Sequence, residues 1–428
     1  MGIKARRAAV VCCLLAVCAL CGCAQNDLYK EEKEEGITLT LFSNLPDRRN
    51  GQGLVEQMII DEYEKMHPDI KIEVESLNDE DYKTKFRAYA IEGMPDIVSV
   101  WGQPSFMLDG LFAELNEEDY ADYGFKPGVL DGFRINGKLY GLPRNTDVFG
   151  FYYNQKLFAE YGWDIPKTYE ELLTLASKIR AAGFAPVAMD GADSWPVADF
   201  YSNILYKLTG GYQKIVSKAI AEADFSDPAF TQSMELLQEA VTAGLFQDGY
   251  DSQDYGMAMN LFTSGQAAMF YMGSWEASMA RNEDIPQEVR ENIGVFLMPK
   301  LPNEKAGVSG IMAWNGGGYA VSAESRNREE AIQFLNFMYQ PDKLSKYGWE
   351  NSIGMSAQDQ SAYITGDETD LQLAFLEILN EADGLSGTPV NDAGSTAFKA
   401  CIEGLITGAA NGVTEMDEFF GELENVCR

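Results

Sequence analysis

Histidine is almost absent from this sequence, which has one, His67, in 428 residues. It stands directly before Pro68 at the expected end of a helix, where a capping or solvated role is far more plausible than catalysis. The sequence also lacks a Walker A loop and a G-x-G-x-x-G turn after a strand, and residues 307–310 lack the final glycine of a nucleophile elbow. We therefore expect a protein that is not an enzyme and that uses no cofactor and no metal.

Basic residues are scarce as well. There are 33 Lys and Arg against 66 Asp and Glu, so the net charge is −33. Such a surface repels phosphate backbones, and we expect no nucleic-acid partner. Hydrophobic residues make up 46% of the chain and charged residues 23%, which is typical of a globular protein, and the length suggests two or three domains.

The apolar run near the N-terminus is too short to cross a bilayer as a helix. It covers residues 8–20 and follows a basic segment with Lys4, Arg6 and Arg7. A membrane-spanning helix needs about 20 apolar residues, whereas a basic segment followed by a short apolar run is typical of a secretory signal peptide. We therefore expect a secreted protein.

Most of the cysteines lie in this same N-terminal segment. Five of the seven are in the first 23 residues, namely Cys12, Cys13, Cys18, Cys21 and Cys23. Their spacing is not that of a zinc site, and one histidine cannot complete a Cys/His ligand set. A metal site is therefore poorly supported. The other two, Cys401 and Cys427, could form a disulfide or remain thiols.

The end of the apolar run resembles the lipobox of bacterial lipoproteins, with Leu20 three residues before Cys23 and the small Gly22 directly before it. This resemblance implies removal of residues 1–22 as a signal peptide and a diacylglyceryl group on Cys23. An uncleaved membrane anchor is the weaker alternative. Residues 23–36 then form a flexible tether, and a lipid anchor alone holds the protein on the outer face of the cytoplasmic membrane.

Helix and strand signals alternate along the rest of the chain. Strands are predicted at 37–42, 70–74 and 96–100, with helices at 54–66 and 81–92 between them, which favours βαβ units and a parallel sheet. Further on, the patterns predict a helix from a capping box at Thr168 and Glu171 to Gly183, a strand at 185–189, a helix at 227–243, strands at 267–272, 294–297 and 318–322, and a helix at 328–339. The sequence contains no repeat or low-complexity linker, which fits two α/β lobes joined by crossing strands.

Four tryptophans stand beside short polar residues near expected strand ends and turns: Trp101, Trp195, Trp275 and Trp314. Ligands of open α/β sheets bind beyond the carboxyl ends of the strands. An indole can stack on the C–H-rich face of a pyranose, and neighbouring Asn, Gln and Asp side chains can bind its hydroxyls. For each tryptophan alone, core packing is an equally good explanation, but the four together favour a carbohydrate site.

A series of segments in a fixed order resembles the extracellular solute-binding proteins of ABC transporters, the family that includes maltose-binding protein. The segments are ITLTLFSN, MIIDEYEKMHPDIKIEV, GMPDIVSVWGQ, GLFAELNE, INGKLYGLPRNTDVFGFYYNQKLF, IPKTYEELLTLASKIRAAG, LFTSGQAAMFYMGSWE and GYAVSAESRNREEAIQFLNFMYQPD. The resemblance implies an α/β fold of the periplasmic-binding-protein-like type II class, with two lobes, a hinge and a ligand cleft between them. It places lobe 1 at 37–147 with a return segment at 316–355, and lobe 2 at 148–315 with a C-terminal helical segment at 356–428.

The resemblance also implies a set of ligand-binding residues, each taken from its own motif. They are Ser43, Asn44, Trp101, Gln103, Asn145, Asp147, Trp195, Trp275, Trp314, Asn315 and Asn391. Among them, Trp275 in its Gly-x-Trp motif is expected to stack on the sugar.

The function implied is capture of a carbohydrate, in particular an oligosaccharide, by a monomer that closes its lobes and delivers the ligand to ABC permease subunits. Three alternatives stay open: the same fold binding a non-sugar solute, a secreted carbohydrate-active enzyme, and a surface adhesin or sensor subunit. Arg144 is the lone basic candidate near the tryptophans, so the sequence does not favour an anionic ligand.

Overall fold

The computed structural model describes residues 36–428 except 211, 306–310 and 383–387. The predicted signal peptide at 1–22, the lipidation of Cys23 and the tether, Gly36 apart, thus lie outside the described residues. Within the described ranges, no helix has the length and apolarity needed to cross a membrane. Cys401 and Cys427 are free thiols in this structure.

The first sheet contains the βαβ units predicted from the sequence. Its strand order is β2-β1-β3-β12-β6, in which β1 is parallel to both β2 and β3, and β12 is antiparallel to β3 and β6. Its strands are β1 (Ile37–Ser43), β2 (Ile70–Ser76), β3 (Ile97–Trp101), β6 (Leu142–Pro143) and β12 (Gly317–Val321). Helices α1 (Gly51–Met66) and α2 (Asp79–Glu92) connect the first three strands. Because β12 comes from far along the chain, this sheet joins segments that are distant in the sequence.

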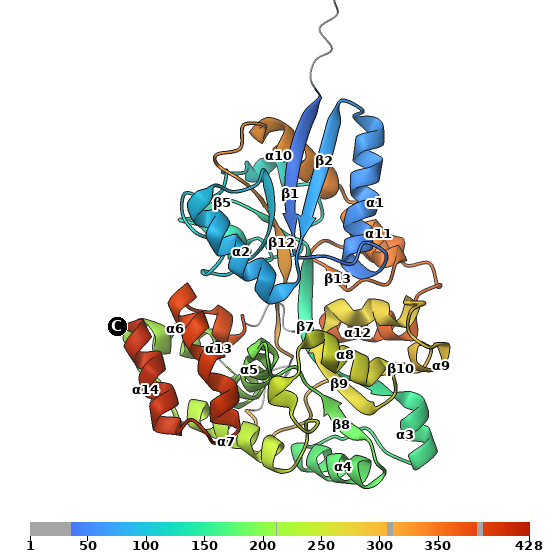
Figure 1. The fold of residues 1–428 in the computed structure, drawn as a ribbon, viewed down its shortest axis with the longest axis vertical. Coiled ribbons are helices and arrows are strands. Elements are labelled where there is room, and N and C mark those ends of the chain that lie inside the picture. Colours follow the sequence, from blue (N-terminus) through green and yellow to red (C-terminus); the bar gives the residue numbers. More distant parts are fainter. Residues whose placement is uncertain (1–35, 211, 306–310, 383–387) are drawn as a thin grey trace, which may run out of the picture. The chain divides into compact units, whose positions relative to one another are not determined.

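The second sheet is built around the long strand β7. Its order is β10-β7-β9-β8, and β11 and β13 pair with the first half of β7. Its strands are β7 (Asn145–Asn154), β8 (Ala185–Ala188), β9 (Ala267–Gly273), β10 (Ile293–Phe296), β11 (Ala313–Asn315) and β13 (Met355–Ser356). In Figure 1, β7 runs from the region of the first sheet into the second. It is therefore one of the crossing strands that the sequence led us to expect.

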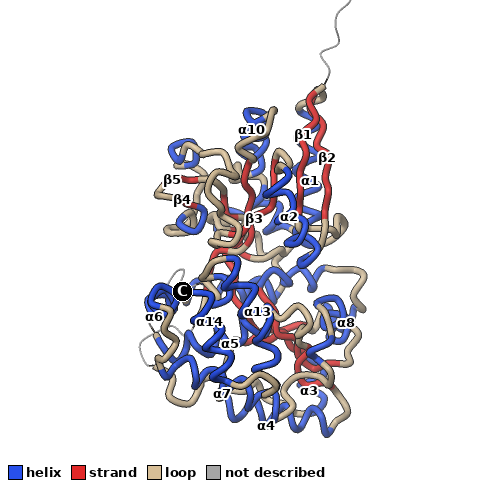
Figure 2. Tube along the Cα trace, turned by 60° about the vertical axis from the view of Figure 1, so that its left-hand side comes forward, coloured by secondary structure: helices blue, strands red, loops and turns tan. Residues whose placement is uncertain are grey.

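Helices surround both sheets. In Figure 1, α10 and α11 lie with α1 and α2 around the first sheet, and the other helices lie around the second. The bounds of the helices after α2 are α3 (Gln155–Tyr161), α4 (Tyr169–Ala181), α5 (Trp195–Thr209), α6 (Tyr212–Glu222), α7 (Pro228–Thr242), α8 (Tyr255–Thr263), α9 (Gln287–Arg290), α10 (Arg328–Met338), α11 (Leu344–Glu350), α12 (Asp370–Glu381), α13 (Thr396–Ala410) and α14 (Met416–Cys427). Helices α5, α13 and α14 lie side by side in Figures 1 and 2.

The remaining elements are short. The 3-10 helices are η1 (Glu117–Tyr120), η2 (Asp131–Phe133), η3 (Tyr250–Ser252), η4 (Ser274–Arg281), η5 (Ser361–Tyr363) and η6 (Val390–Asp392), and a small hairpin pairs β4 (Arg134–Ile135) with β5 (Lys138–Leu139). Two of them, η4 and η6, contribute residues to the site described below.

The start of α4 follows the predicted capping pattern in part. The Thr168 side chain accepts a hydrogen bond from the Glu171 backbone N–H at 3.2 Å, as predicted. The Glu171 carboxylate accepts from the backbone N–H of Lys167 at 2.7 Å, one residue before the position that a full capping box requires. The first of these interactions satisfies a backbone donor that an uncapped helix would leave without a partner.

Two sets of buried apolar side chains form separate cores. The first takes residues between Leu39 and Leu142 and again between Tyr319 and Ile353. The second takes residues between Val148 and Trp314 and again between Trp349 and Leu423. The lobe boundaries given above stay a prediction, and this division of the core is the observation that supports it.

Candidate functional site

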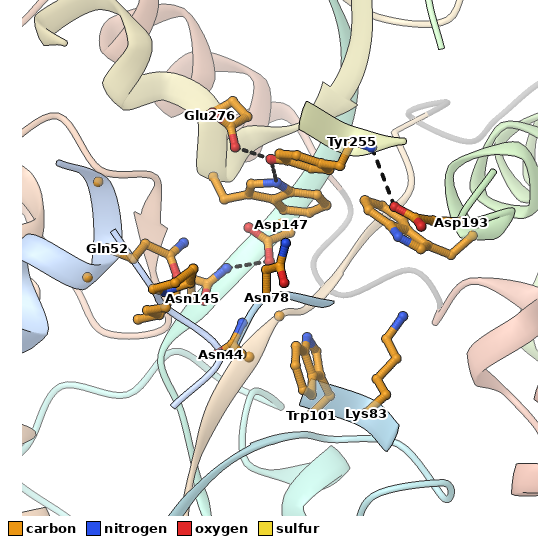
Figure 3. A pocket seen from close by; sticks show the side chains of 18 of the residues that line it. Asn44, Gln52, Asn78, Lys83, Trp101, Asn145, Asp147, Asp193, Tyr255 and Glu276 are labelled. Atoms are coloured by element: carbon orange, nitrogen blue, oxygen red, sulfur yellow. Dashed lines mark hydrogen bonds between the residues drawn. The ribbon is translucent and has the colours of Figure 1, made fainter. Parts of the chain in front are cut away.

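A cleft of about 710 Å³ lies between the two lobes and is lined by residues of both. That volume falls in the range of about 300–1,000 Å³ usual for small-molecule sites. Figure 3 shows Trp101 and Lys83 on one side of it, Tyr255 and Asp193 on the opposite side, and Asp147 between them. The first two residues belong to β3 and α2 of the first lobe, and Tyr255 begins α8 of the second. A ligand in this cleft would therefore contact both lobes.

Nine of the eleven residues predicted from the sequence line this cleft. They are Asn44, Trp101, Gln103, Asn145, Asp147, Trp195, Trp275, Trp314 and Asn391. Ser43 and Asn315 do not line it: the buried Ser43 hydroxyl donates to Glu56 at 3.0 Å, and the Asn315 amide donates to the backbone carbonyl of Val129. The structure thus gathers most of the predicted set at one place, while their contact with a ligand stays a prediction.

Three of the four tryptophans pack around Phe149. Its ring is stacked on Trp314 and meets Trp275 edge-on, with ring centroids 5.4 Å apart in both pairs, and Trp195 lies 6.0 Å from Trp275. Trp195 and Trp314 are 8% and 5% exposed, whereas Trp275 and Trp101 are half-buried. Core packing and ligand contact are therefore compatible here, and Trp275 and Trp101 present the more accessible rings.

The orientation of Trp275 is fixed by two neighbours. Strand β9 ends at Gly273. We expected Trp275 at the end of this strand, and it lies just beyond the strand, in η4. A Cβ on Gly273 would approach carbon atoms of the indole to 2.0 Å, so the ring lies directly over this glycine. The indole N–H donates to the Tyr255 hydroxyl at 3.1 Å, and that hydroxyl donates to Glu276 (Figure 3). The ring is held in place before any ligand arrives.

The start of β7 places a carboxylate at the floor of the cleft. Asp147 is 2% exposed and accepts hydrogen bonds from Asn145 and from the Ser274 hydroxyl, the latter at 3.1 Å. A Cβ on Gly316 would lie 1.9 Å from its Oδ2, so this glycine makes room for the carboxylate. Burial is the main influence on Asp147 and raises its pKa to about 6, although the hydrogen bonds and Arg144 act in the opposite direction.

Arg144 is held by the interior of the first lobe. Its guanidinium donates to the Tyr319 hydroxyl at 3.1 Å and to the Asn145 side chain at 3.3 Å. Tyr319 in turn donates to the buried carboxylate of Glu56. The one basic residue that the sequence placed near the tryptophans is therefore already engaged.

A buried ionic network at η6 and α13 was missed by the sequence analysis. Lys399 forms ion pairs with Asp392 and with Glu403, the second at 2.7 Å. From the other lobe, the Gln103 side-chain amide donates to Asp392 at 2.7 Å. Asp199 on α5 also lines the cleft and is 4% exposed. The one available signal was Asp199 itself, since it stands between apolar residues in VADFY.

Other cleft residues gave no sequence signal, because nothing in their neighbourhood distinguishes them from solvated polar residues. They include Gln52, Asn78, Lys83, Asp193, Tyr255 and Glu276 (Figure 3). None of the described residues forms a group of three or more side chains suited to hold a metal ion.

The sequence pattern of the family described as "Bacterial extracellular solute-binding protein" matches residues 49–343. The chain belongs to this family. Its members bind solutes, so this family member is a binding protein and not an enzyme, as the sequence indicated.

Three comparisons illustrate the relationship. The chain is 25% identical to the multiple sugar-binding protein of Streptococcus mutans serotype c over 347 residues, which is 78% of this chain and 77% of that protein. It is 25% identical to the galactooligosaccharide-binding protein of Bacillus subtilis over 351 residues, 78% and 76% of the two chains. A solved chitin oligosaccharide binding protein superimposes with a TM-score of 0.78 at 21% identity, covering 92% of this chain and 98% of that one. The structural likeness confirms the predicted type II periplasmic-binding-protein fold.

Proposed function

We propose that the protein is a lipid-anchored, monomeric extracellular receptor that captures an oligosaccharide between its lobes and delivers it to the permease subunits of an ABC importer. The observation that carries this proposal is a single cleft in which half-buried indoles face a polar floor. Trp101 comes from one lobe and Trp275 from the other, with Asp147 between the two lobes. The sugar-binding names of the two curated relatives support the carbohydrate part.

The lining of the cleft suits a sugar because it combines ring faces with many amides. Eight asparagine and glutamine residues line it: Asn44, Asn50, Gln52, Asn78, Gln103, Asn145, Asn282 and Asn391. Each amide offers both donors and acceptors, as sugar hydroxyls require. The apolar face of a pyranose is meanwhile buried against an indole.

Capture follows from the position of the cleft between the lobes. A ligand that contacts Trp101 and Trp275 together stabilises only the arrangement in which the two lobes approach one another. The protein already has contacts of this kind, since Gln103 bonds Asp392 and the Lys83 ammonium lies 5.9 Å from the Trp195 ring centroid. These contacts favour closure, and the ligand adds the remaining free energy.

The test is a titration of tryptophan fluorescence and melting temperature against a panel of oligosaccharides, with peptides and polyamines as comparison ligands. A true ligand at a hundred times its Kd stabilises the fold by about 2.7 kcal/mol. A response to peptides or polyamines without a response to any sugar would show that the carbohydrate assignment is wrong.

Affinity for the oligosaccharide is expected to fall as the pH drops below about 6, the pKa of Asp147. Sugar hydroxyls that donate to this carboxylate bind its ionised form, so a proton on Asp147 competes with the ligand. Above pH 6 the carboxylate is already ionised and affinity levels off; below it, affinity falls by up to about tenfold per pH unit. Calorimetric titrations at pH 7.5, 6 and 5 measure the effect. Asp147→Asn should bind more weakly at pH 7.5 and lose this dependence, and an unchanged pH profile in that variant would contradict the role of Asp147.

Replacing Cys23 by serine is expected to release the protein from the cell surface into the medium, because serine carries no thiol for the diacylglyceryl group. Cell fractionation measures the distribution, and mass spectrometry of the mature N-terminus identifies the lipid. Cys21→Ser is the matched control, since Cys21 leaves with the predicted signal peptide. Retention of the Cys23→Ser protein at the membrane would disprove the lipid anchor.

A further inference from the structure

Acidic side chains outnumber basic ones in the cleft. Of the described residues, nine with a carboxylate line it: Asp47, Glu80, Asp81, Asp147, Asp193, Asp199, Asp254, Glu276 and Asp392. The cations that line it are Lys83, Arg144 and Lys399. The excess is six negative charges if every group is ionised.

Each of these three cations is already engaged within the protein. Lys83 forms an ion pair with Glu80 at 2.6 Å, and Lys399 pairs with Asp392 and Glu403. Arg144 donates to the Tyr319 hydroxyl, as described above. An anionic ligand would therefore have to share one of these cations with the protein's own groups.

Two of these carboxylates, Asp199 and Asp392, are buried together where α5, η6 and α13 meet. We name this part of the cleft the acidic end and define it by Asp199, Asn391, Asp392 and Lys399. Among the residues that the structure describes, Asp199 is in none of the ion pairs, and its Oδ1 has no hydrogen-bond partner. The charged groups that act on it are Asp392, Lys399, Glu403 and Lys83. Burial, and then the charge of Asp392, raise the pKa of Asp199. A further negative charge placed here would likewise be disfavoured by burial and repelled by Asp392.

The amide oxygens of Gln103 and Asn391 at the acidic end are free to accept hydrogen bonds from a ligand. The Gln103 amide nitrogen donates to Asp392, and the Asn391 amide nitrogen donates to Glu403 at 3.0 Å. An ionised carboxylate can only accept hydrogen bonds, so each amide must turn its nitrogen toward the carboxylate and its oxygen away from it. The oxygens of both amides are buried and have no hydrogen-bond partner within the described part of the chain. Sugar hydroxyls can donate to them, and an ionised carboxylate cannot.

We propose that the acidic end is a charge-selective subsite that accepts a neutral sugar residue and excludes a uronic acid, with Asp199 and Asp392 as the specificity-determining residues. This inference rests on the proposed function and names the substrate class within it as uncharged oligosaccharides.

Matched pairs of ligands test the proposal. Neutral malto-, xylo-, galacto- and chito-oligosaccharides are titrated first by calorimetry. Each neutral oligosaccharide that binds and carries a terminal primary alcohol is then compared with the same sugar in which that alcohol is oxidised to a carboxylate. At low salt the oxidised form should bind at least about 100-fold more weakly, because like charges in a desolvated site repel strongly. Raising the salt to about 0.5 M should narrow this ratio by screening.

Two variants assign the effect to the acidic end. The double variant Asp199→Asn with Asp392→Asn keeps the shape and removes the acid at both positions, whichever of the two side chains holds a proton, and it should narrow the ratio at least about tenfold. Asp248→Asn is the control, since it removes the same charge from an exposed side chain that pairs with Arg180 and does not line the cleft. It should leave the ratio unchanged, and equal narrowing in the double variant and in this control would refute the assignment to the acidic end.

The outcomes separate the two proposals. Equal affinity for neutral and oxidised sugars would disprove the charge-selective subsite but would not contradict the proposed oligosaccharide receptor. Failure to bind any sugar overturns the receptor proposal and the subsite with it. If the double variant does not fold, Asp392→Asn alone replaces it, and an unchanged ratio in that variant contradicts electrostatic exclusion at the acidic end.

Discussion

Replacing Trp275 by alanine is expected to weaken oligosaccharide binding about 100-fold, because buried tryptophan contacts carry a large share of the free energy at binding sites. Trp275 is one of the two half-buried tryptophans of the cleft, and its position over Gly273 is set before the ligand binds. A preorganised ring loses little entropy on binding, so its contact with the sugar contributes nearly in full. Calorimetric titration gives the affinity, and a thermal melt checks that the variant is folded.

Gly273 provides a second way to disturb the same ring without removing it. A methyl group at this position would overlap the indole, so Gly273→Ala should displace Trp275 and weaken binding in the same direction. Gly404→Ala is the matched control. Gly404 lies exposed within α13, and no heavy atom lies within 4 Å of a Cβ built on it. Because alanine favours helix more than glycine, this control should bind normally and gain about 0.5–1 kcal/mol of stability.

Trp163→Ala controls for the loss of a tryptophan in general. Trp163 packs on Tyr161 with ring centroids 4.8 Å apart and does not line the cleft. Its removal should leave affinity unchanged. If Trp275→Ala binds as tightly as Trp163→Ala, the stacking role of Trp275 is wrong.

The alternating part of the fold could be predicted, whereas β7 and α5, which are buried along all or nearly all of their length, were not. Strands such as β1 and helices such as α4 have one buried and one solvent-exposed face. Their apolar residues therefore recur with the period of a strand or of a helix, and this period identifies the element. In β7 every residue except Tyr153 is buried, and in α5 all residues are buried. A segment without a wet face shows no alternation between apolar and polar positions, so its secondary structure cannot be identified from periodicity.

The site was predictable where a motif marks the end of a strand, as for Trp101 and Trp275. Ser43 also follows this pattern, but its side chain turns inward to Glu56, which local sequence cannot reveal. The ionic network was missed because Asp199 and Lys399 are 200 residues apart in the chain and meet only when α5 packs near α13. Contacts of this range depend on tertiary structure and leave no local pattern.

Lys399→Met is expected to cost about 3–5 kcal/mol of unfolding free energy, the usual loss when one member of a buried ion pair is removed. Lys399 is 9% exposed, and among the described residues it is the one cation paired with both Asp392 and Glu403. Burial alone would lower the pKa of its amine, but the charges of these two carboxylates raise it, so the lysine is charged in the folded protein. Methionine has a similar length but leaves both carboxylates without a counter-charge.

Urea unfolding measures this loss, and Lys218→Met is the control. Lys218 forms an exposed pair with Glu222 at 3.7 Å, and such pairs contribute about 0–1 kcal/mol. Adding Asp392→Asn and Glu403→Gln to Lys399→Met should restore most of the lost stability, because the unpaired charges are then gone. The loss in the single variant should also shrink as the pH falls and the unpaired carboxylates take up protons. A Lys399→Met protein no less stable than Lys218→Met would mean that the network does not hold this end of the cleft together.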